Sequence, residues 1–123
     1  MVKLIYCAQP GRLPNKKRKV MSFVSRHGGA PLHPFQAFPF GLYEGGPIGR
    51  EKTMKFCRRL ISISDEVWLF GVSEGTLEDL NHAVKIKKPI KLHLEFDPEW
   101  KRYYNKLKRK YGYPLGKLQS KNK

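Results

Sequence analysis

Acidic residues are scarce in this sequence, and the shortage bears on every inference about its partners. The 123 residues include 10 Asp and Glu against 25 Lys and Arg, which gives a formal net charge of +15 at pH 7. Charge of this size does not determine a fold, but it attracts polyanions. Thermophile-like surfaces are also rich in lysine, yet they normally gain Glu together with Lys. We therefore expect a nucleic-acid partner, RNA rather than DNA, with a merely solvated lysine-rich surface as the alternative.

Cysteine and long apolar runs are also in short supply. The two cysteines, Cys7 and Cys57, lie in apolar stretches without a CxxC pair, which predicts buried thiols in a reducing cytoplasm. The four histidines lack metal-ligand spacing with the cysteines, so we expect neither a metal nor a cofactor. No apolar run approaches the ~18 residues of a membrane span, and the N-terminal run is too short for a signal peptide. We expect no membrane association.

Two common glycine motifs of nucleotide-binding loops, GxxxxGKS/T and GxGxxG, are missing as well.

The chain length and its 40% of hydrophobic residues suit one packed core. We expect a single α/β domain over residues 1–112. Residues 113–123 contain Lys117, Lys121 and Lys123 but no acid, and we expect a basic tail that stays structureless until it meets a polyanion.

Apolar runs alternate along the chain with segments of helical periodicity. Strands are predicted at 3–8, 30–34, 66–71 and 89–96, and helices at 14–27, 50–64, 76–87 and 97–112. The segment 35–49, rich in aromatic residues, glycine and proline, is predicted to be an ordered loop. This alternation favours a Rossmann-like three-layer α/β fold with a four-stranded, mostly parallel sheet, extended by a basic C-terminal helix.

Two turns are expected to meet at one edge of this sheet. AQPGR (8–12) follows the first strand and GVSEGT (71–76) follows the third. Ligands of open parallel sheets bind beyond the carboxyl ends of the strands, so these turns mark the expected pocket. Arg50, at the start of a predicted helix, either binds a phosphate there or simply faces solvent. The acids Glu74 and Glu78 favour a neutral sugar or base over a triphosphate.

Three local predictions concern the last two helices. Leu77, Leu80 and Val84 should point inward from the helix at 76–87. Asp97 should be the N-cap of the final helix. That helix has an apolar stripe that should pack on the sheet and leave its cations exposed, namely Trp100, Tyr103, Tyr104, Leu107 and Tyr111.

The segments LIYCAQPGR, PLHPFQAFPF, IGRE, SDEVWLFG and SEGTLEDLNHAVKIKKPI occur in this order, over about residues 3–92. In this order they resemble the nucleoside 2-deoxyribosyltransferase-like superfamily, and within it a branch of small, poorly characterised proteins. The resemblance implies a Rossmann-like sheet with a sugar-binding pocket. It places the ligand near the first turn, at Tyr6, Gln9, Pro10 and Gly11.

The resemblance also implies roles after the second turn. It matches the family's small-residue turn to Gly71, Ser73 and Gly75, and an acid before the third strand to Asp65. In active members, a Glu four residues after the last of these glycines attacks the sugar; the matching position here is Asp79, one methylene shorter. Two alternatives stay open: Asp65 holds the turn before its strand, and Asp79 completes a capping box with Thr76 as N-cap.

Two functions follow from these observations. In the first, the chain is an RNA-associated protein, for example a component of the ribosome, that uses the fold as a scaffold. In the second, it is a nucleoside or nucleotide N-glycosidase or deoxyribosyltransferase with Asp in place of the nucleophilic Glu. A hydrolase acting on nucleotides within a nucleic acid would combine the two. The cations expected to contact nucleic acid are Lys16, Lys17, Arg18, Lys19, Lys101, Arg102, Lys106, Lys108, Arg109, Lys110 and Lys117. The oligomeric state is not predicted.

Overall fold

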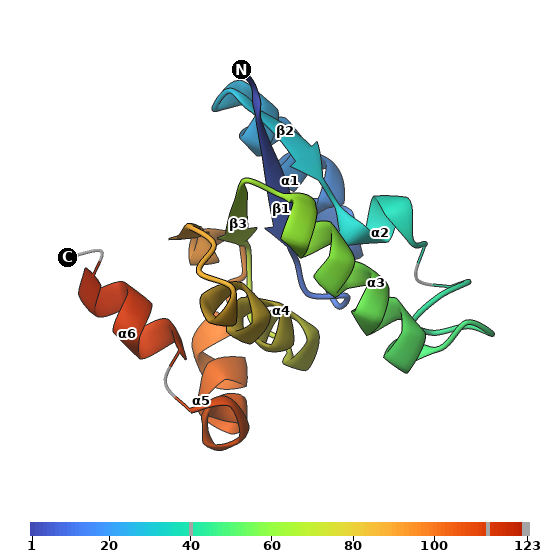
Figure 1. Cartoon of the computed structure of the whole chain (residues 1–123). Coiled ribbons are helices and arrows are strands. Elements are labelled where there is room, and N and C mark those ends of the chain that lie inside the picture. The colour runs from blue at the N-terminus through green and yellow to red at the C-terminus, as the bar shows by residue number, and fades with distance from the viewer. Residues whose placement is uncertain (40, 113, 122–123) are drawn as a thin grey trace.

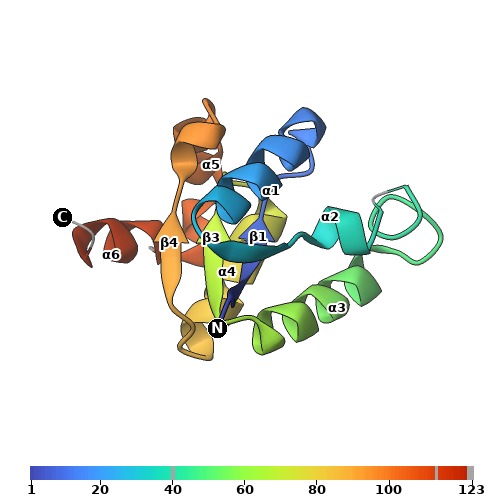
Figure 2. The same cartoon turned by 90° about the horizontal axis from the view of Figure 1, so that it is seen from above.

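A four-stranded parallel sheet forms the centre of the computed structural model, which describes residues 1–39, 41–112 and 114–121. The strand order is β2-β1-β3-β4, and each neighbouring pair is parallel. Figure 1 labels β2, β1 and β3, and Figure 2 labels β1, β3 and β4. The predicted α/β three-layer fold is therefore confirmed, with a sheet that is parallel throughout. The strands are β1 (Lys3–Ala8), β2 (Gly29–Leu32), β3 (Glu66–Leu69) and β4 (Ile90–Leu92).

Helices connect and follow these strands. The α-helices are α1 (Lys17–Arg26), α2 (Pro34–Ala37), α3 (Arg50–Ile63), α4 (Glu74–Lys85), α5 (Trp100–Tyr111) and α6 (Pro114–Lys121), with short 3-10 turns at Pro14–Lys16 and Leu94–Phe96. Within the described residues, no helix combines the length and apolar character needed to cross a bilayer.

Side chains alternate across the sheet and make two cores, one on each face. From β1, Tyr6 and Ala8 pack with residues of α3 and α4 on one face. Ile5 and Cys7 point to the opposite face and pack with residues of α1. Helix α1 lies against that face of the sheet (Figure 2). This alternation is the two-residue period of a strand, and it explains why the sheet is covered on both sides. Every residue of β3, Glu66 included, is buried, as expected of a parallel strand whose sheet is covered on both faces.

Helix α4 differs from its prediction in where it begins and which side chains it buries. It starts at Glu74, with Ser73 as N-cap. Its buried face includes Leu77, Leu80 and Ala83, whereas Val84 is 49% exposed. The prediction for Val84 was wrong because Ala83, three residues after Leu80, lies nearer the centre of the inward face.

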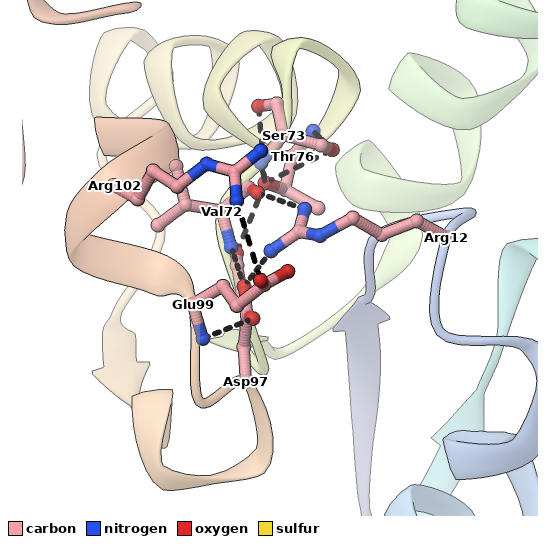
Figure 3. Close-up of polar contacts among 8 residues, drawn as sticks. Arg12, Val72, Ser73, Thr76, Asp97, Glu99 and Arg102 are labelled. Atoms are coloured by element: carbon pink, nitrogen blue, oxygen red, sulfur yellow. Dashed lines mark hydrogen bonds and ion pairs between the residues drawn. The ribbon is translucent and has the colours of Figure 1, made fainter. Parts of the chain in front are cut away.

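Asp97 is also placed differently from its prediction. Helix α5 begins at Trp100 and gains no side-chain cap, so Asp97 is not its N-cap. The Asp97 side chain is instead buried, with 1% of the residue exposed. Its Oδ2 accepts the Val72 N–H at 3.0 Å and pairs with the Arg12 guanidinium, while Oδ1 accepts the Glu99 N–H at 3.0 Å (Figure 3). One carboxylate thus joins three loops at the carboxyl edge.

The segment after Gly112 is not the structureless tail that was expected. Residues Pro114–Lys121 form α6, and Leu115 is fully buried in the core that contains α4. Leu118 is partly buried against the same core, one turn further on. Two leucines at helical spacing therefore give this basic segment an apolar face to bury. Lys123 lies outside the described residues. The apolar stripe of α5 packs against this core, as predicted.

The Asp97 contacts lead to a prediction about stability. Asp97→Ala should lower the free energy of unfolding by about 3 kcal/mol or more, because it leaves the largely buried Arg12 without its carboxylate and the Val72 N–H without an acceptor. Urea denaturation measures the change. Glu95→Ala, at an exposed acid two residues away, is the control and should change stability by less than about 0.5 kcal/mol. Equal effects of the two variants would contradict the assigned role of Asp97.

Candidate functional site

A cavity of about 230 Å³ lies at the carboxyl edge of the sheet. Its walls come from the loop after β1, the segment after β2, the start of α3 and the start of α4. This volume is somewhat below the range of about 300–1,000 Å³ that is usual for drug-sized ligands, so the pocket suits one small molecule. Seven residues proposed from the sequence line it together: Tyr6, Gln9, Gly11, Arg50, Ser73, Gly75 and Asp79.

The turn after β3 caps helix α4 without using Asp79, so the Asp79 side chain remains available to the pocket. The Ser73 Oγ accepts the Thr76 N–H at 3.1 Å, and the Thr76 Oγ1 accepts the Ser73 N–H at 2.8 Å. Ser73 is therefore the N-cap and Thr76 the third helical residue. The predicted capping box with Thr76 as N-cap and Asp79 as its partner was wrong, because a better-placed pair one turn earlier does this work. Asp79 lies in the second turn, where no cap is required.

The Asp79 carboxyl group is buried with only one of its oxygens bonded. The residue is 6% exposed, and its Oδ2 accepts a hydrogen bond from the Tyr6 hydroxyl at 3.0 Å. Its Oδ1 has no hydrogen-bond partner within the described part of the chain. An unsatisfied buried carboxyl oxygen is costly, so it needs a functional or structural reason.

Burial sets the protonation of this group. Burial raises the pKa of Asp79 to about 7, the Tyr6 hydrogen bond acts in the opposite direction, and the nearby charges of Glu78 and Glu44 raise it further. Cys57, which also lines the pocket, has its pKa raised to about 12, chiefly by burial, and stays a thiol. Burial likewise raises the pKa of Tyr6 well above 10.0. Asp79 is thus a group that can gain or lose a proton near neutral pH.

Gln9 is held in one orientation by a buried histidine that the sequence analysis did not select. His33 Nδ1 accepts the Phe35 N–H at 3.2 Å, and its Nε2 lies 2.8 Å from Gln9 Oε1. Because Nδ1 accepts, Nε2 carries the proton and donates to Gln9. The Gln9 amide nitrogen donates in turn to the Leu13 carbonyl at 2.6 Å. Burial lowers the pKa of His33 to about 4, so the arrangement persists at neutral pH.

Arg50 lies at the rim of the pocket among carboxylates. Its guanidinium is 2.9 Å from Glu44, 3.4 Å from Glu78 and 3.7 Å from Glu74. Helix α5 adds Lys110, 2.6 Å from Glu74, and the Tyr111 hydroxyl, which donates to Glu78 at 3.0 Å. Glu44, Lys110 and Tyr111 were not predicted from the sequence to belong to the site. In the sequence, the signal for Glu44 is its place in a glycine-rich loop. The contact between α5 and α4 is visible only in the structure.

Two residues proposed for the site, Asp65 and Gly71, do not line the pocket. Asp65 is exposed at the opposite end of β3, where its Oδ2 accepts the Leu4 N–H at 2.7 Å and its own N–H donates to the Leu4 carbonyl at 2.8 Å. It therefore holds the turn before its strand, which was the alternative interpretation of this residue. Gly71 lets two loops meet, because a Cβ there would lie 2.7 Å from Pro10 Cγ and 2.9 Å from Asp97 Cβ.

The cations proposed for nucleic-acid contact lie outside the pocket in two groups. The group around the start of α1 has Arg18 and Lys19 exposed, with Lys16 and Lys17 half-buried. The second group is exposed on α5 and α6 and consists of Lys101, Arg102, Lys106, Lys108, Arg109, Lys110 and Lys117. Within the described residues, no three His, Cys, Asp or Glu side chains are grouped so that they could hold a metal ion.

Comparison with known proteins shows the family to which the chain belongs. A family described as "Domain of unknown function (DUF7768)" matches residues 8–93, and the chain is a member of it. The matched segment contains the turns after β1 and β3, Arg50 and Asp79, whereas α5 and α6 lie beyond it. No curated protein matches the chain.

The raised pKa of Asp79 predicts a dependence of stability on pH. Because the group binds its proton more tightly in the folded chain than in the unfolded one, its contribution is complete below about pH 4 and is lost as the pH rises through about 7. Asp79→Asn cannot ionise and avoids this loss. From pH 5 to pH 8, the variant should therefore gain about 2–3 kcal/mol of stability relative to the wild type.

Urea denaturation at several pH values measures this difference. Glu51→Gln makes the same chemical change at an exposed position of α3 and should follow the wild type throughout. Parallel curves for the wild type and Asp79→Asn would show that Asp79 does not titrate near neutrality.

Proposed function

We propose that this chain binds a nucleoside or nucleotide in the Asp79 pocket and cleaves or transfers its N-glycosidic bond, with Asp79 as the nucleophile. The observation that carries the proposal is the state of this carboxyl group: buried, lining a small pocket, not used as a helix cap, and unbonded at one oxygen. The resemblance to the deoxyribosyltransferase-like superfamily supports it, because the residues that it selects at the two turns, except Pro10 and Gly71, line one cavity with Asp79.

The reaction has two displacements at the anomeric carbon of the sugar. An Asp79 oxygen attacks this carbon, the carbon–nitrogen bond breaks, and the base leaves with the bonding electrons and takes up a proton. A glycosyl ester of Asp79 results. Water, or the nitrogen of a second base, then attacks the same carbon, loses a proton and restores the carboxylate. The Tyr6 hydroxyl, 3.0 Å from Oδ2, orients the carboxyl group throughout.

The shorter side chain sets a limit on rate. Asp places its oxygens one methylene nearer the helix than the Glu of active relatives, and a misplacement of about 1 Å can cost about 100-fold in rate. The raised pKa acts in the same direction below pH 7, because only the ionised group is a nucleophile. We therefore expect a slow enzyme whose rate increases with pH through about 7.

Release of free base, measured by liquid chromatography, tests this proposal. The wild type should release base from at least one common nucleoside or nucleotide, with a rising pH limb near 7. Asp79→Asn should reduce release by at least about 1,000-fold while its circular dichroism spectrum stays native. The matched control Glu51→Gln should keep full activity. No release by the wild type from any common nucleoside or nucleotide would refute the proposal.

A second candidate function, RNA binding, is favoured by a separate observation on α5. The aromatic side chains of its inward stripe are partly buried against the core, whereas Lys106, Lys108 and Arg109 are exposed and have no carboxylate partner within the described chain. Such a face suits phosphates rather than base stacking, so it would bind RNA, free or in a ribonucleoprotein such as the ribosome, with little sequence preference. Lys110 is already paired with Glu74.

Charge reversal on α5 tests RNA binding. The double variant Lys108→Glu and Arg109→Glu should weaken binding to a single-stranded RNA oligonucleotide. It should also make the slope of log K against log salt shallower by about 1.4, the value for two lost phosphate contacts. The control is Lys52→Glu and Lys55→Glu, which reverses two exposed charges on α3. Equal losses in both double variants would mean that only net charge matters and would remove α5 as an RNA site.

A further inference from the structure

We infer that the Asp79 pocket selects uncharged nucleosides and rejects their 5′-phosphates, and that Glu44 and Glu74 are the residues that set this preference. The inference rests on the proposed function and specifies its substrate class. The charges that line the pocket are the first observation that supports it. Glu44, Glu74 and Asp79 are carboxyl groups, and Arg50 is the one Lys or Arg among the lining residues that the structure describes. A phosphate would therefore enter a site in which acids outnumber cations.

Arg50 is only partly free to offset this excess. Its Nη1 bonds the Glu44 carboxylate at 2.9 Å, whereas its Nη2 lies 3.4 Å from Glu78 and 3.7 Å from Glu74 and makes no hydrogen bond within the described residues. A phosphate that bonded Nη2 would therefore lie close to these carboxylates. Like charges brought together in this way oppose binding. Arg50 thus holds the rim together rather than receiving an anion.

The N-terminus of α4 is closed to anions for a related reason. Helix N-termini attract phosphates through their unpaired N–H groups. Here the Ser73 and Thr76 N–H groups are already bonded within the capping box. The first residue of the helix, Glu74, has a carboxylate that lines the pocket at that same end. An incoming phosphate would meet this charge before it reached the remaining N–H groups.

Residues of helix α5 bond two acids at the rim, Glu74 and Glu78. Lys110 bonds Glu74 at 2.6 Å, and the Tyr111 hydroxyl donates to Glu78 at 3.0 Å. These contacts restrain the Glu74 carboxylate, which lines the pocket, and the Glu78 carboxylate beside Arg50. Since α5 lies outside the segment that matches the family, the acidic rim is completed by a part of the chain that the family match does not include.

A neighbouring hollow offers an alternative route for a phosphate. It has a volume of about 210 Å³, shares Gln9, Gly11 and Phe35 with the pocket, and is bordered by Lys17. A phosphate that reached Lys17 could avoid the acidic rim. The inference therefore predicts that Lys17 does not contribute to ligand affinity.

Isothermal titration calorimetry on the full chain tests the inference with matched ligand pairs. The probes are the common 2′-deoxynucleosides and the 5′-monophosphate of each. The wild type should bind a nucleoside at least about tenfold more tightly than its monophosphate. The double variant Glu44→Gln and Glu74→Gln keeps the side-chain shapes but removes two of the three carboxylate charges beside Arg50. It should shift this ratio at least about tenfold toward the monophosphate. The control Glu51→Gln should leave the ratio unchanged.

The outcomes separate this inference from the proposed function. If neither nucleosides nor monophosphates bind, both fail. If the wild type binds monophosphates as tightly as nucleosides or more tightly, the inference alone fails, and loss of that binding in Lys17→Met would place the phosphate in the neighbouring hollow. An unchanged ratio in the double variant would overturn the role assigned to Glu44 and Glu74.

Discussion

The buried carboxylate of Asp97 is the contact on which the geometry of the carboxyl edge depends. It joins Arg12, from the loop that also carries Gln9 and Gly11, to Val72, which directly precedes the N-cap of α4 (Figure 3). Two walls of the pocket are therefore fixed relative to each other by one charged group. The absence of a side chain at Gly71 permits the close approach that this requires. Since breaking a buried ion pair costs more than forming it gains, the junction acts mainly as a constraint on geometry.

Around this junction, the molecule separates two kinds of electrostatic environment. The pocket contains carboxyl groups whose cations are already paired, whereas the outer face of α5 carries cations without partners among the described residues. Burial makes Asp79 costly to ionise, and the single Tyr6 hydrogen bond offsets only part of that cost. A net charge of +15 thus describes the surface and not the pocket. Lys110 links the two environments by pairing with Glu74.

The sequence was informative where one physical rule acts alone. The strands and the meeting of the two turns were predictable, because a parallel sheet brings the carboxyl ends of its strands to one edge. Prediction failed where several local solutions compete. Both Ser73 with Thr76 and Thr76 with Asp79 have capping-box spacing, and only the packed structure selects the first. His33 and Lys110 reach the site through contacts between distant segments, which no local pattern reveals.

Intact-protein and peptide mass spectrometry would test the central claim, that the Asp79 carboxylate forms a bond to a sugar. The protein would be incubated with 2′-fluoro-2′-deoxynucleosides, whose electron-withdrawing fluorine destabilises the oxocarbenium-like transition state and slows hydrolysis of the glycosyl ester. We expect a mass increase equal to the fluorinated sugar residue, located on the peptide that contains Asp79 and absent in Asp79→Asn. Ordinary nucleosides cleaved by the wild type without any adduct, or with an adduct on another residue, would contradict it.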